Sequence, residues 1–324
     1  MSVKVASVGL GSWGRELARG AHAAGLEVVA CYARSEQART EFAAAIGCKP
    51  ASSIEELLAD PTVEGLLIAT SHQSHRRWVE AAARAGKHVF IEKPLALSVE
   101  DARACVKEAE AAGVVLQVGF QRRRHPAHRE MKRLINAGSI GEIETLEAHH
   151  SLPNRIPDGA WRWDEKESPL GSMTSLGIHQ IENLHYLAGP ITRVAATSRR
   201  GRSVSIDEAT ALAFEFQSGA VGTLISSFFT PWHISLAIHG TEGSAFADRD
   251  GAALSYQRRG EQQPAVIELP EIDAVADQLI EFASCVREGK RPEVSGFEGL
   301  AVVAVLDAAQ RSVATGSFEV VDSW

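Results

Sequence analysis

The sequence has few cysteines, no long apolar run and no excess of basic residues. Only 4 of its 324 residues are cysteine, and none forms a CxxC pair, which predicts reduced, mostly buried thiols in a cytosolic protein. No apolar run approaches the roughly 18–20 residues of a membrane span, so we expect no membrane contact. The chain enters a strand pattern at once (Val3, Val5, Val8), so we expect no signal peptide and a cytoplasmic location.

The charge balance excludes a general nucleic-acid partner. Acidic residues outnumber basic ones by 41 to 33, which gives a net charge of -8. Binding to a phosphate backbone releases counterions through an excess of Lys and Arg, and no such excess is present. A chain of 324 residues is long enough to form two domains.

The first part of the chain predicts an α/β domain over residues 1–120. Strand-like and helix-like segments alternate there, which is typical of a parallel sheet. The predicted strands are 3–8, 27–31, 65–69, 88–91 and 114–118. The predicted helices are 13–24, 36–46, 54–59, 74–85 and 99–112. We expect Ser53 to cap the helix 54–59, with Glu56 completing a capping box, and Ser98 to cap the helix 99–112.

Residues 121–324 predict an α+β domain with a large, mostly antiparallel open sheet, because strand patterns there follow one another directly. The predicted strands are 142–150, 192–198, 210–217, 222–229 and 234–239, with a hairpin turn at Ser218-Gly219. The predicted helices are 126–137, 173–187, 275–288 and 299–315.

A glycine motif near the start predicts a dinucleotide site. Gly9-Leu10-Gly11-Ser12-Trp13-Gly14 follows a strand and opens a helix, which is the context that a GxGxxG motif requires. Glycines at these positions permit a tight turn, close approach of a pyrophosphate and close helix packing, while the helix N-terminus offers N–H groups to the anion. The alternative is a glycine turn without a ligand.

The end of the second predicted strand favours NADP. An NAD enzyme places Asp or Glu there, about 20 residues past the glycines, to accept the ribose hydroxyls. This chain has Ala33-Arg34-Ser35, and an arginine with a hydroxyl suits a 2′-phosphate. NAD stays open, because Glu36 follows directly. The other predicted cofactor contacts are Thr70, Ser71, His75, Glu92, Lys93 and Gln121.

Two residues are candidates for proton transfer and for stabilising the charge that develops on the substrate oxygen. Lys93, in Glu92-Lys93-Pro94, follows an apolar strand, and ligands of open α/β sheets sit at the carboxyl ends of the strands. Its ammonium could stabilise a developing alkoxide. His179 enters a helix of the second domain and would titrate near neutrality. The alternatives are a surface lysine and a buried structural histidine.

These motifs together resemble the Gfo/Idh/MocA family (glucose–fructose oxidoreductase and inositol dehydrogenase). The resemblance covers nearly the whole chain. It rests on the glycine motif and on the segments 85–89, 92–95, 118–123, 138–143, 177–179 and 239–244.

The resemblance implies a Rossmann domain, a C-terminal sheet that forms a homodimer or homotetramer, and hydride exchange between a nicotinamide and a sugar-like or polyol carbon. By position, Lys93 and His179 look like the family's catalytic pair. Gln121 stands where members commonly have Asn, and Ser175 where the pattern usually has Asp. A serine carries no charge at neutral pH, so this replacement could alter substrate choice or weaken dehydrogenation.

Other residues could border the substrate. Aromatic rings with an arginine suit a sugar, which makes Trp161, Arg162 and Trp163 candidates, together with Arg155. Core packing is the alternative for both tryptophans. Only one of His149 and His150 can face a given side of a strand. We expect no metal, because the helical spacing of His179, Glu182 and His185 spreads them over a wide arc.

The leading hypothesis is therefore an NAD(P)-dependent oxidoreductase for a secondary alcohol, or for the carbonyl in reverse. One alternative is a lyase, glycosidase or isomerase that keeps its cofactor and oxidises the substrate transiently. Another is a sensor or structural subunit that binds NADP after its catalysis has decayed, for which Ser175 is the hint.

Overall fold

The computed structural model describes residues 2–153, 156, 157, 159–201 and 205–322. The chain forms two compact units. The first consists of Met1–Gln121 with Asp273–Leu300, and the second of Arg122–Ile272 with Ala301–Trp324. This division differs from the simple one at residue 120, because a late helix returns to the first unit.

That helix is α8 (Ala274–Glu288). Its apolar residues Val275, Leu279 and Phe282 share a buried cluster with Val5 of the first strand and Leu17 of the first helix. Burying this stripe against the first unit removes apolar area from water, which stabilises the position of the returning segment.

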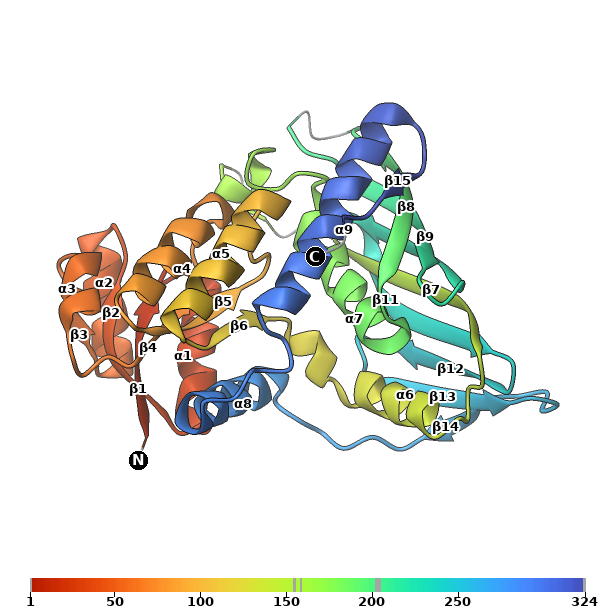
Figure 1. Cartoon of the computed structure of the whole chain (residues 1–324), viewed down its shortest axis with the longest axis horizontal. Helices are drawn as coiled ribbons and strands as arrows, with labels where there is room; N and C mark the ends of the chain where they lie inside the picture. Colours follow the sequence, from red (N-terminus) through yellow and green to blue (C-terminus); the bar gives the residue numbers. More distant parts are fainter. Residues whose placement is uncertain (1, 154–155, 158, 202–204, 323–324) are drawn as a thin grey trace. The chain divides into compact units, whose positions relative to one another are not determined.

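The first unit is built on a six-stranded parallel sheet with the order β3-β2-β1-β4-β5-β6, the order of a Rossmann fold. Its strands are β1 (Val3–Val8), β2 (Leu26–Tyr32), β3 (Lys49–Pro50), β4 (Gly65–Ile68), β5 (His88–Glu92) and β6 (Leu116–Gly119). Its other helices are α1 (Ser12–Ala23), α2 (Glu36–Ile46), α3 (Ile54–Ala59), η1 (His72–Ser74), α4 (His75–Arg84) and α5 (Val99–Ala112). Helices α4 and α5 lie side by side on one face of the sheet, and α1 packs with α8 (Figure 1).

Local capping fixes several of these helices as predicted. The Ser53 hydroxyl accepts a hydrogen bond from the Glu56 N–H at 3.2 Å, and the Ser98 hydroxyl accepts one from Asp101 at 3.1 Å. The Glu56 carboxylate binds back to Ser52 rather than to the cap residue itself. Each cap satisfies an N–H group that a helix start leaves open.

The second unit is built on a nine-stranded sheet with the order β14-β13-β12-β11-β7-β10-β9-β8-β15. Its strands are β7 (Ile143–Pro153), β8 (Ile191–Arg199), β9 (Ala209–Phe216), β10 (Val221–Ser227), β11 (Phe229–Gly240), β12 (Gly243–Asp248), β13 (Ala253–Arg258), β14 (Ala265–Ile267) and β15 (Glu319–Val320). All neighbours are antiparallel except β7 and β10. The helical segments are η2 (Gln121–Arg124), α6 (Pro126–Asn136), η3 (Trp161–Trp163), the π-helix η4 (Met173–Gly177), α7 (Ile178–Ala188) and α9 (Gly296–Thr315), whose first residues belong to the first unit.

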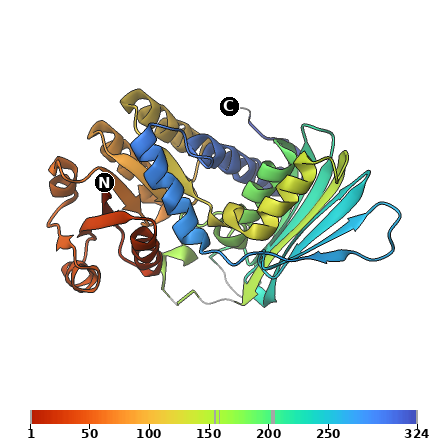
Figure 2. The same ribbon diagram turned by 90° about the horizontal axis from the view of Figure 1, so that it is seen from below.

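The two faces of this sheet differ. Helices α6 and α7 lie against one face, and within the described ranges no helix covers the other face (Figure 2). Along strands such as β9 and β10, residues that face the helices are buried and the residues between them are more exposed. In β10, Leu224 is fully buried, whereas Val221 and Ile225 are 48% and 45% exposed. The hairpin predicted at Ser218-Gly219 joins β9 to β10, with Gly219 at φ +93°.

The structure adds elements that the sequence analysis did not predict. Strands β3, β12, β13, β14 and β15 are new, and the helix predicted over 173–187 begins with a π-helical turn. The new strands are short or rich in small residues, so neighbouring strands decide their conformation more than their own pattern does. In the part of the chain that the structure describes, no helix has the length and apolar character needed to cross a bilayer.

Candidate active site

The glycine motif follows β1 and lies beside the end of β4, at the point where the strand order reverses. Gly9 has φ +89°, and a Cβ there would collide with the Ala69 carbonyl. A Cβ on Gly14 would collide with the Gly9 carbonyl. The Gly9 N–H donates to the Tyr32 carbonyl at 3.0 Å, which ties this loop to the end of β2. Glycine is therefore required at both positions, as predicted.

Gly11 differs from these two glycines. A Cβ at this position would meet no protein atom within 4 Å. Packing against the protein therefore does not require glycine here, and the space beside Gly11 is open. Gly11 is also the N-cap of α1, and the first turn holds no acidic residue. Open space in front of an uncapped helix start fits the pyrophosphate of a dinucleotide. Leu10 packs in the core below, Trp13 is half-buried, and Ser12 is exposed.

Arg39 contacts the backbone of the loop that follows β2. Arg39 donates through Nη1 to the Ala33 carbonyl at 2.7 Å and to the Arg34 carbonyl at 3.3 Å. The Ser35 hydroxyl caps α2 by accepting from the Ala38 N–H at 3.3 Å, and the Arg34 side chain is exposed. The sequence analysis did not identify Arg39, because it contacts backbone carbonyl groups, which every residue has, and no sequence motif marks such a contact.

A buried histidine joins two loops at the carboxyl edge of the sheet. His75 is fully buried, and its ring nitrogens contact the Pro94 carbonyl at 2.7 Å and the Thr70 carbonyl at 3.2 Å. Ser74 donates to the Ser71 carbonyl at 2.6 Å and braces the same turn. His75 thus packs between the Lys93-Pro94 loop and the loop after β4, and its single N–H can donate to one of the two carbonyl groups. It was predicted to contact the cofactor, and the structure places it beneath these loops, where no surface is exposed.

The burial of His75 predicts a pH effect on stability. Burial, with a smaller contribution from the nearby Lys93 charge, lowers the pKa of His75 from 6.5 to about 4. The unfolded chain binds a proton between these values and the folded chain does not, so this stability is complete above pH 6.5 and is lost as the pH falls toward 4. At about pH 5 we expect a loss on the order of 2 kcal/mol in the free energy of unfolding.

Urea unfolding of wild type and His75→Asn at about pH 5 and pH 8 measures this contribution. The variant should be less stable at the higher pH and show a smaller change between the two values. His22→Asn, at an exposed histidine of α1, is the control and should follow wild type. An equal pH dependence in wild type and His75→Asn would contradict this role.

Two further predicted residues come from the end of β5 and from the segment that follows β6. Glu92 is buried and pairs with Gly119 of β6, and a Cβ on Gly119 would lie 2.9 Å from the Glu92 carboxylate. The absence of a side chain there leaves room for the carboxylate. Gln121 is buried at the start of η2. Lys93 itself is half-buried.

In the second unit, the segment carrying Ser175 and His179 is irregular. Ser175 lies within the π-helical turn, and α7 begins at Ile178. A Cβ on Gly177 would collide with Met173, which explains why glycine occupies this tight turn. Single π-helical turns occur often at functional sites. Ser175 is half-buried and His179 is buried.

The strand β7 places its two histidines on opposite faces, as the alternation predicts. His150 is fully buried, with its ring centroid 6.0 Å from that of His179. His149 lies on the face without helices, 4.6 Å from the ring of His233. His150 was not identified as a site residue, since only the sheet register shows that it faces α7.

A buried ion pair anchors α7. Arg123 donates through Nε to the Glu182 carboxylate at 2.6 Å, and its guanidinium stacks on the ring of Tyr186. Glu182 is thereby engaged by an arginine, and burial lowers the pKa of His185 to about 4. Within the described residues, no group of three His, Cys, Asp or Glu side chains could hold a metal ion.

The predicted aromatic segment forms a short helical turn. The Arg162 guanidinium stacks on the Trp161 ring at 4.2 Å, and the Trp163 indole donates to the Pro157 carbonyl at 3.0 Å. All three side chains are half-buried. Arg155, the fourth candidate for the substrate, lies outside the described residues.

The structure thus assembles the candidates in two sets. The glycine motif, the Arg34 loop, Thr70, His75 and the Lys93 loop gather in the first unit. His179, Ser175 and the Trp161 turn belong to the second unit.

Comparison with known proteins decides the family. Residues 3–120 match the family described as "Oxidoreductase family, NAD-binding Rossmann fold", and residues 128–246 match the GFO/IDH/MocA C-terminal domain. The chain belongs to the Gfo/Idh/MocA family. The resemblance read from the motifs is confirmed, and so are the Rossmann fold and the mostly antiparallel second sheet.

Two curated relatives and one solved structure show what this chain is similar to. The chain is 30% identical over 323 residues to 1,5-anhydro-D-fructose reductase of Ensifer adhaerens, which covers 95% of this chain and 96% of that protein. It is 30% identical over 302 residues to D-xylose 1-dehydrogenase (NADP(+)) 2 of Haloferax volcanii, covering 90% and 91%. Levoglucosan dehydrogenase in complex with NADH and L-sorbose has the same fold, with a TM-score of 0.93, 22% identity and full coverage of both chains. This chain is therefore an NAD(P)-binding oxidoreductase.

Proposed function

We propose that this protein is an NADP-preferring dehydrogenase or reductase that acts on a secondary alcohol, or its carbonyl, in a sugar-like or cyclitol-like substrate. One observation carries the proposal. His75 contacts both the Lys93-Pro94 loop and the loop at Thr70, and this supports a role for Lys93 at the carboxyl edge of the sheet, where a Rossmann fold binds its nicotinamide coenzyme. The names of the relatives support a sugar-type substrate.

In this proposal the bound coenzyme supplies the hydride acceptor. His179 removes the hydroxyl proton, and the Lys93 ammonium donates a hydrogen bond that stabilises the oxyanion as charge develops. The two residues could exchange these roles. The Gly9–Gly14 loop holds the pyrophosphate at the start of α1, which fixes the position of the coenzyme.

Several residues could hold the substrate. Ser175 offers a neutral hydroxyl where the family pattern usually has a carboxylate, so it can bind a substrate hydroxyl without adding charge. The stacked pair Trp161 and Arg162 presents a flat ring edge and a guanidinium, which suit a pyranose or cyclitol ring. Gln121 can donate and accept through its amide.

Arg34 is the residue that we propose for the 2′-phosphate. Its guanidinium is exposed, and Arg39 fixes its backbone. In Arg34→Asp a carboxylate would repel the phosphate and accept the ribose hydroxyls of NAD. We expect NADP affinity to fall by roughly 10- to 100-fold relative to NAD affinity, since charge-assisted hydrogen bonds contribute about 1.5–3 kcal/mol.

Coenzyme titration followed by fluorescence measures this ratio. Arg103→Asp makes the same charge change at an exposed arginine of α5, and it should leave the NADP/NAD ratio as in wild type. If Arg34→Asp also leaves the ratio unchanged, Arg34 does not bind the phosphate.

A panel of sugars and cyclitols, offered with NADP and with NAD, tests the function. Reduced coenzyme should accumulate with at least one substrate, and faster with NADP. A bound coenzyme that survives purification, with substrate conversion but no net reduced coenzyme, would favour the lyase, glycosidase or isomerase alternative. Coenzyme binding with no turnover on the panel would favour a decayed sensor or structural subunit.

We also propose that the uncovered face of the nine-stranded sheet joins two copies in a homodimer or homotetramer. This face carries exposed Val221 and Ile225 on a central strand, beside Ala211 and Ala213 of β9. Small and apolar side chains on a wide sheet suit close stacking against a second sheet. Light scattering of the purified protein measures the subunit number directly.

A further inference from the structure

Two of the four cysteines lie together at the end of β2. Cys31 is the penultimate residue of β2, and Cys48 comes just before β3. The parallel register pairs Cys31 with Pro50. Because side chains alternate along a strand, Cys48 faces the same side as Pro50 and therefore as Cys31. Cys48 also packs against the buried cluster that contains Cys31.

Both cysteines are held by regular structure. Cys31 lies between β1 and β3, and its carbonyl accepts from the Ala51 N–H at 2.9 Å. Cys48 follows Gly47, the left-handed residue that ends α2, and the Cys48 N–H donates to the Ala43 carbonyl at 3.2 Å. This is a helix-ending arrangement that fixes the direction of the chain. The closeness of the thiols is thus a property of the fold.

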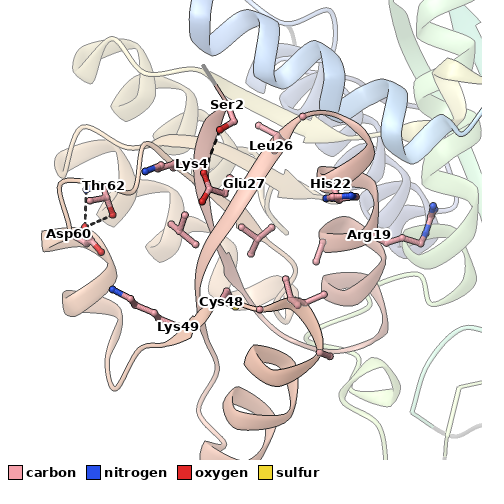
Figure 3. Close-up of a pocket in the computed structure, with 17 residues that line it drawn as sticks. Ser2, Lys4, Arg19, His22, Leu26, Glu27, Cys48, Lys49, Asp60 and Thr62 are labelled. Carbon is pink, nitrogen blue, oxygen red and sulfur yellow. Dashed lines mark hydrogen bonds between the residues drawn. The ribbon is translucent and has the colours of Figure 1, made fainter.

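The two thiols differ in exposure and in acidity. Cys31 is fully buried, whereas Cys48 is half-buried and lines an open pocket with His22 and Lys49 (Figure 3). Interaction with Cys31 lowers the pKa of Cys48, and interaction with Cys48 together with burial raises the pKa of Cys31. Cys48 is therefore the thiol with more thiolate and with access to a reagent.

We propose that Cys31 and Cys48 form a redox-active dithiol that a hydroperoxide oxidises to a disulfide. The Cys48 sulfur attacks one peroxide oxygen, the O–O bond breaks, and Cys48 becomes a sulfenic acid while the other oxygen leaves as water. The Cys31 sulfur then attacks the Cys48 sulfur, and hydroxide leaves with the Cys31 proton as a second water. Two thiols lose two electrons, and one hydrogen peroxide gains them.

The location connects this site to the coenzyme loop. The cross-link would enclose residues 32–47, which include Arg34, Ser35 and Arg39. The Cys31 S–H donates to the Arg39 carbonyl at 3.7 Å, and oxidation removes this hydrogen. Since Arg39 holds the Arg34 backbone, oxidation should weaken NADP binding, by about fivefold if one neutral hydrogen bond is lost. This last step rests on the proposed role of Arg34.

The test is peptide mapping of the full-length protein before and after hydrogen peroxide, without coenzyme. The expected result is a linked pair of peptides containing Cys31 and Cys48, with the loss of two hydrogen atoms, reversed by dithiothreitol. Cys105 is the internal control, because it is buried and burial raises its pKa to about 12. It should remain a thiol under the same conditions. Two results would overturn the proposal. In one, peroxide leaves both Cys31 and Cys48 as thiols. In the other, Cys48 is oxidised to a sulfinic acid while Cys31 remains a thiol.

Variants and coenzyme titration separate the two parts of the inference. In Cys48→Ser, peroxide should leave Cys31 reduced, whereas Cys105→Ala should still form the disulfide. NADP titration of the oxidised and reduced wild type then measures the coupling. A disulfide with unchanged NADP affinity would overturn the coupling alone. Equal binding of NAD and NADP by the reduced protein would refute the proposed coenzyme preference and leave the mass result intact.

Discussion

Lys93→Met should reduce kcat by about 1000-fold and leave the dissociation constant of NADP within about twofold of wild type. Methionine keeps the length and most of the volume of lysine but cannot donate a hydrogen bond or carry charge. His75 holds the loop through the Pro94 carbonyl, which is a backbone group, so the loop should keep its position in the variant. The loss would therefore fall on the chemical step rather than on coenzyme binding.

Steady-state turnover with the best substrate of the panel, together with coenzyme titration, measures both quantities. Lys107→Met, at an exposed lysine of α5, is the matched control and should behave as wild type. An unchanged kcat would remove Lys93 from the chemistry. A parallel loss of coenzyme affinity and kcat would assign it to binding instead.

Gly11→Val should weaken coenzyme binding by about 100-fold, which corresponds to about 2.7 kcal/mol, without destabilising the protein. The φ of Gly11 is -72°, which any residue adopts, and its Cβ would meet no protein atom within 4 Å. The protein therefore tolerates the side chain, but the pyrophosphate that we expect in the open space does not. Titration with NADP and thermal unfolding measure the two effects.

Gly14→Ala gives the opposite pattern and serves as the contrast. Its new methyl group would collide with the Gly9 carbonyl, so we expect a lower Tm even without coenzyme. If Gly11→Val binds NADP as tightly as wild type, the glycine motif is a structural turn and does not cradle a dinucleotide.

The sequence predicted the parts of the fold that have strong local patterns. Helix α5 begins at Val99 and ends at Ala112 as expected, because Ser98 caps it and Gly113 ends it in the left-handed region. Strand β12 was missed because its residues, such as Ala245 and Ala247, carry little apolar signal, and pairing with β11 and β13 defines the strand instead. The return of α8 to the first unit was missed because an apolar stripe shows that a helix is buried but not where.

In the candidate site, too, the residues with a strong local pattern were predictable and the others were not. Gly9 and Gly14 were predictable because a motif with a fixed spacing states why glycine is needed. Arg39 contacts the backbone carbonyl groups of Ala33 and Arg34, and His75 contacts those of Thr70 and Pro94. No residue type records such contacts. The Cys31–Cys48 pair was likewise hidden, because the two cysteines become neighbours only through the register of β2 and β3.

The transfer of deuterium from substrate to coenzyme is the most direct test of the proposed function. The substrate found on the panel would be prepared with deuterium on the carbinol carbon, and the coenzyme would be recovered and weighed by mass spectrometry. We expect the deuterium on the reduced nicotinamide of released NADPH, and a strong loss of this signal in Lys93→Met. Conversion of the substrate with no deuterium in released coenzyme would contradict a dehydrogenase.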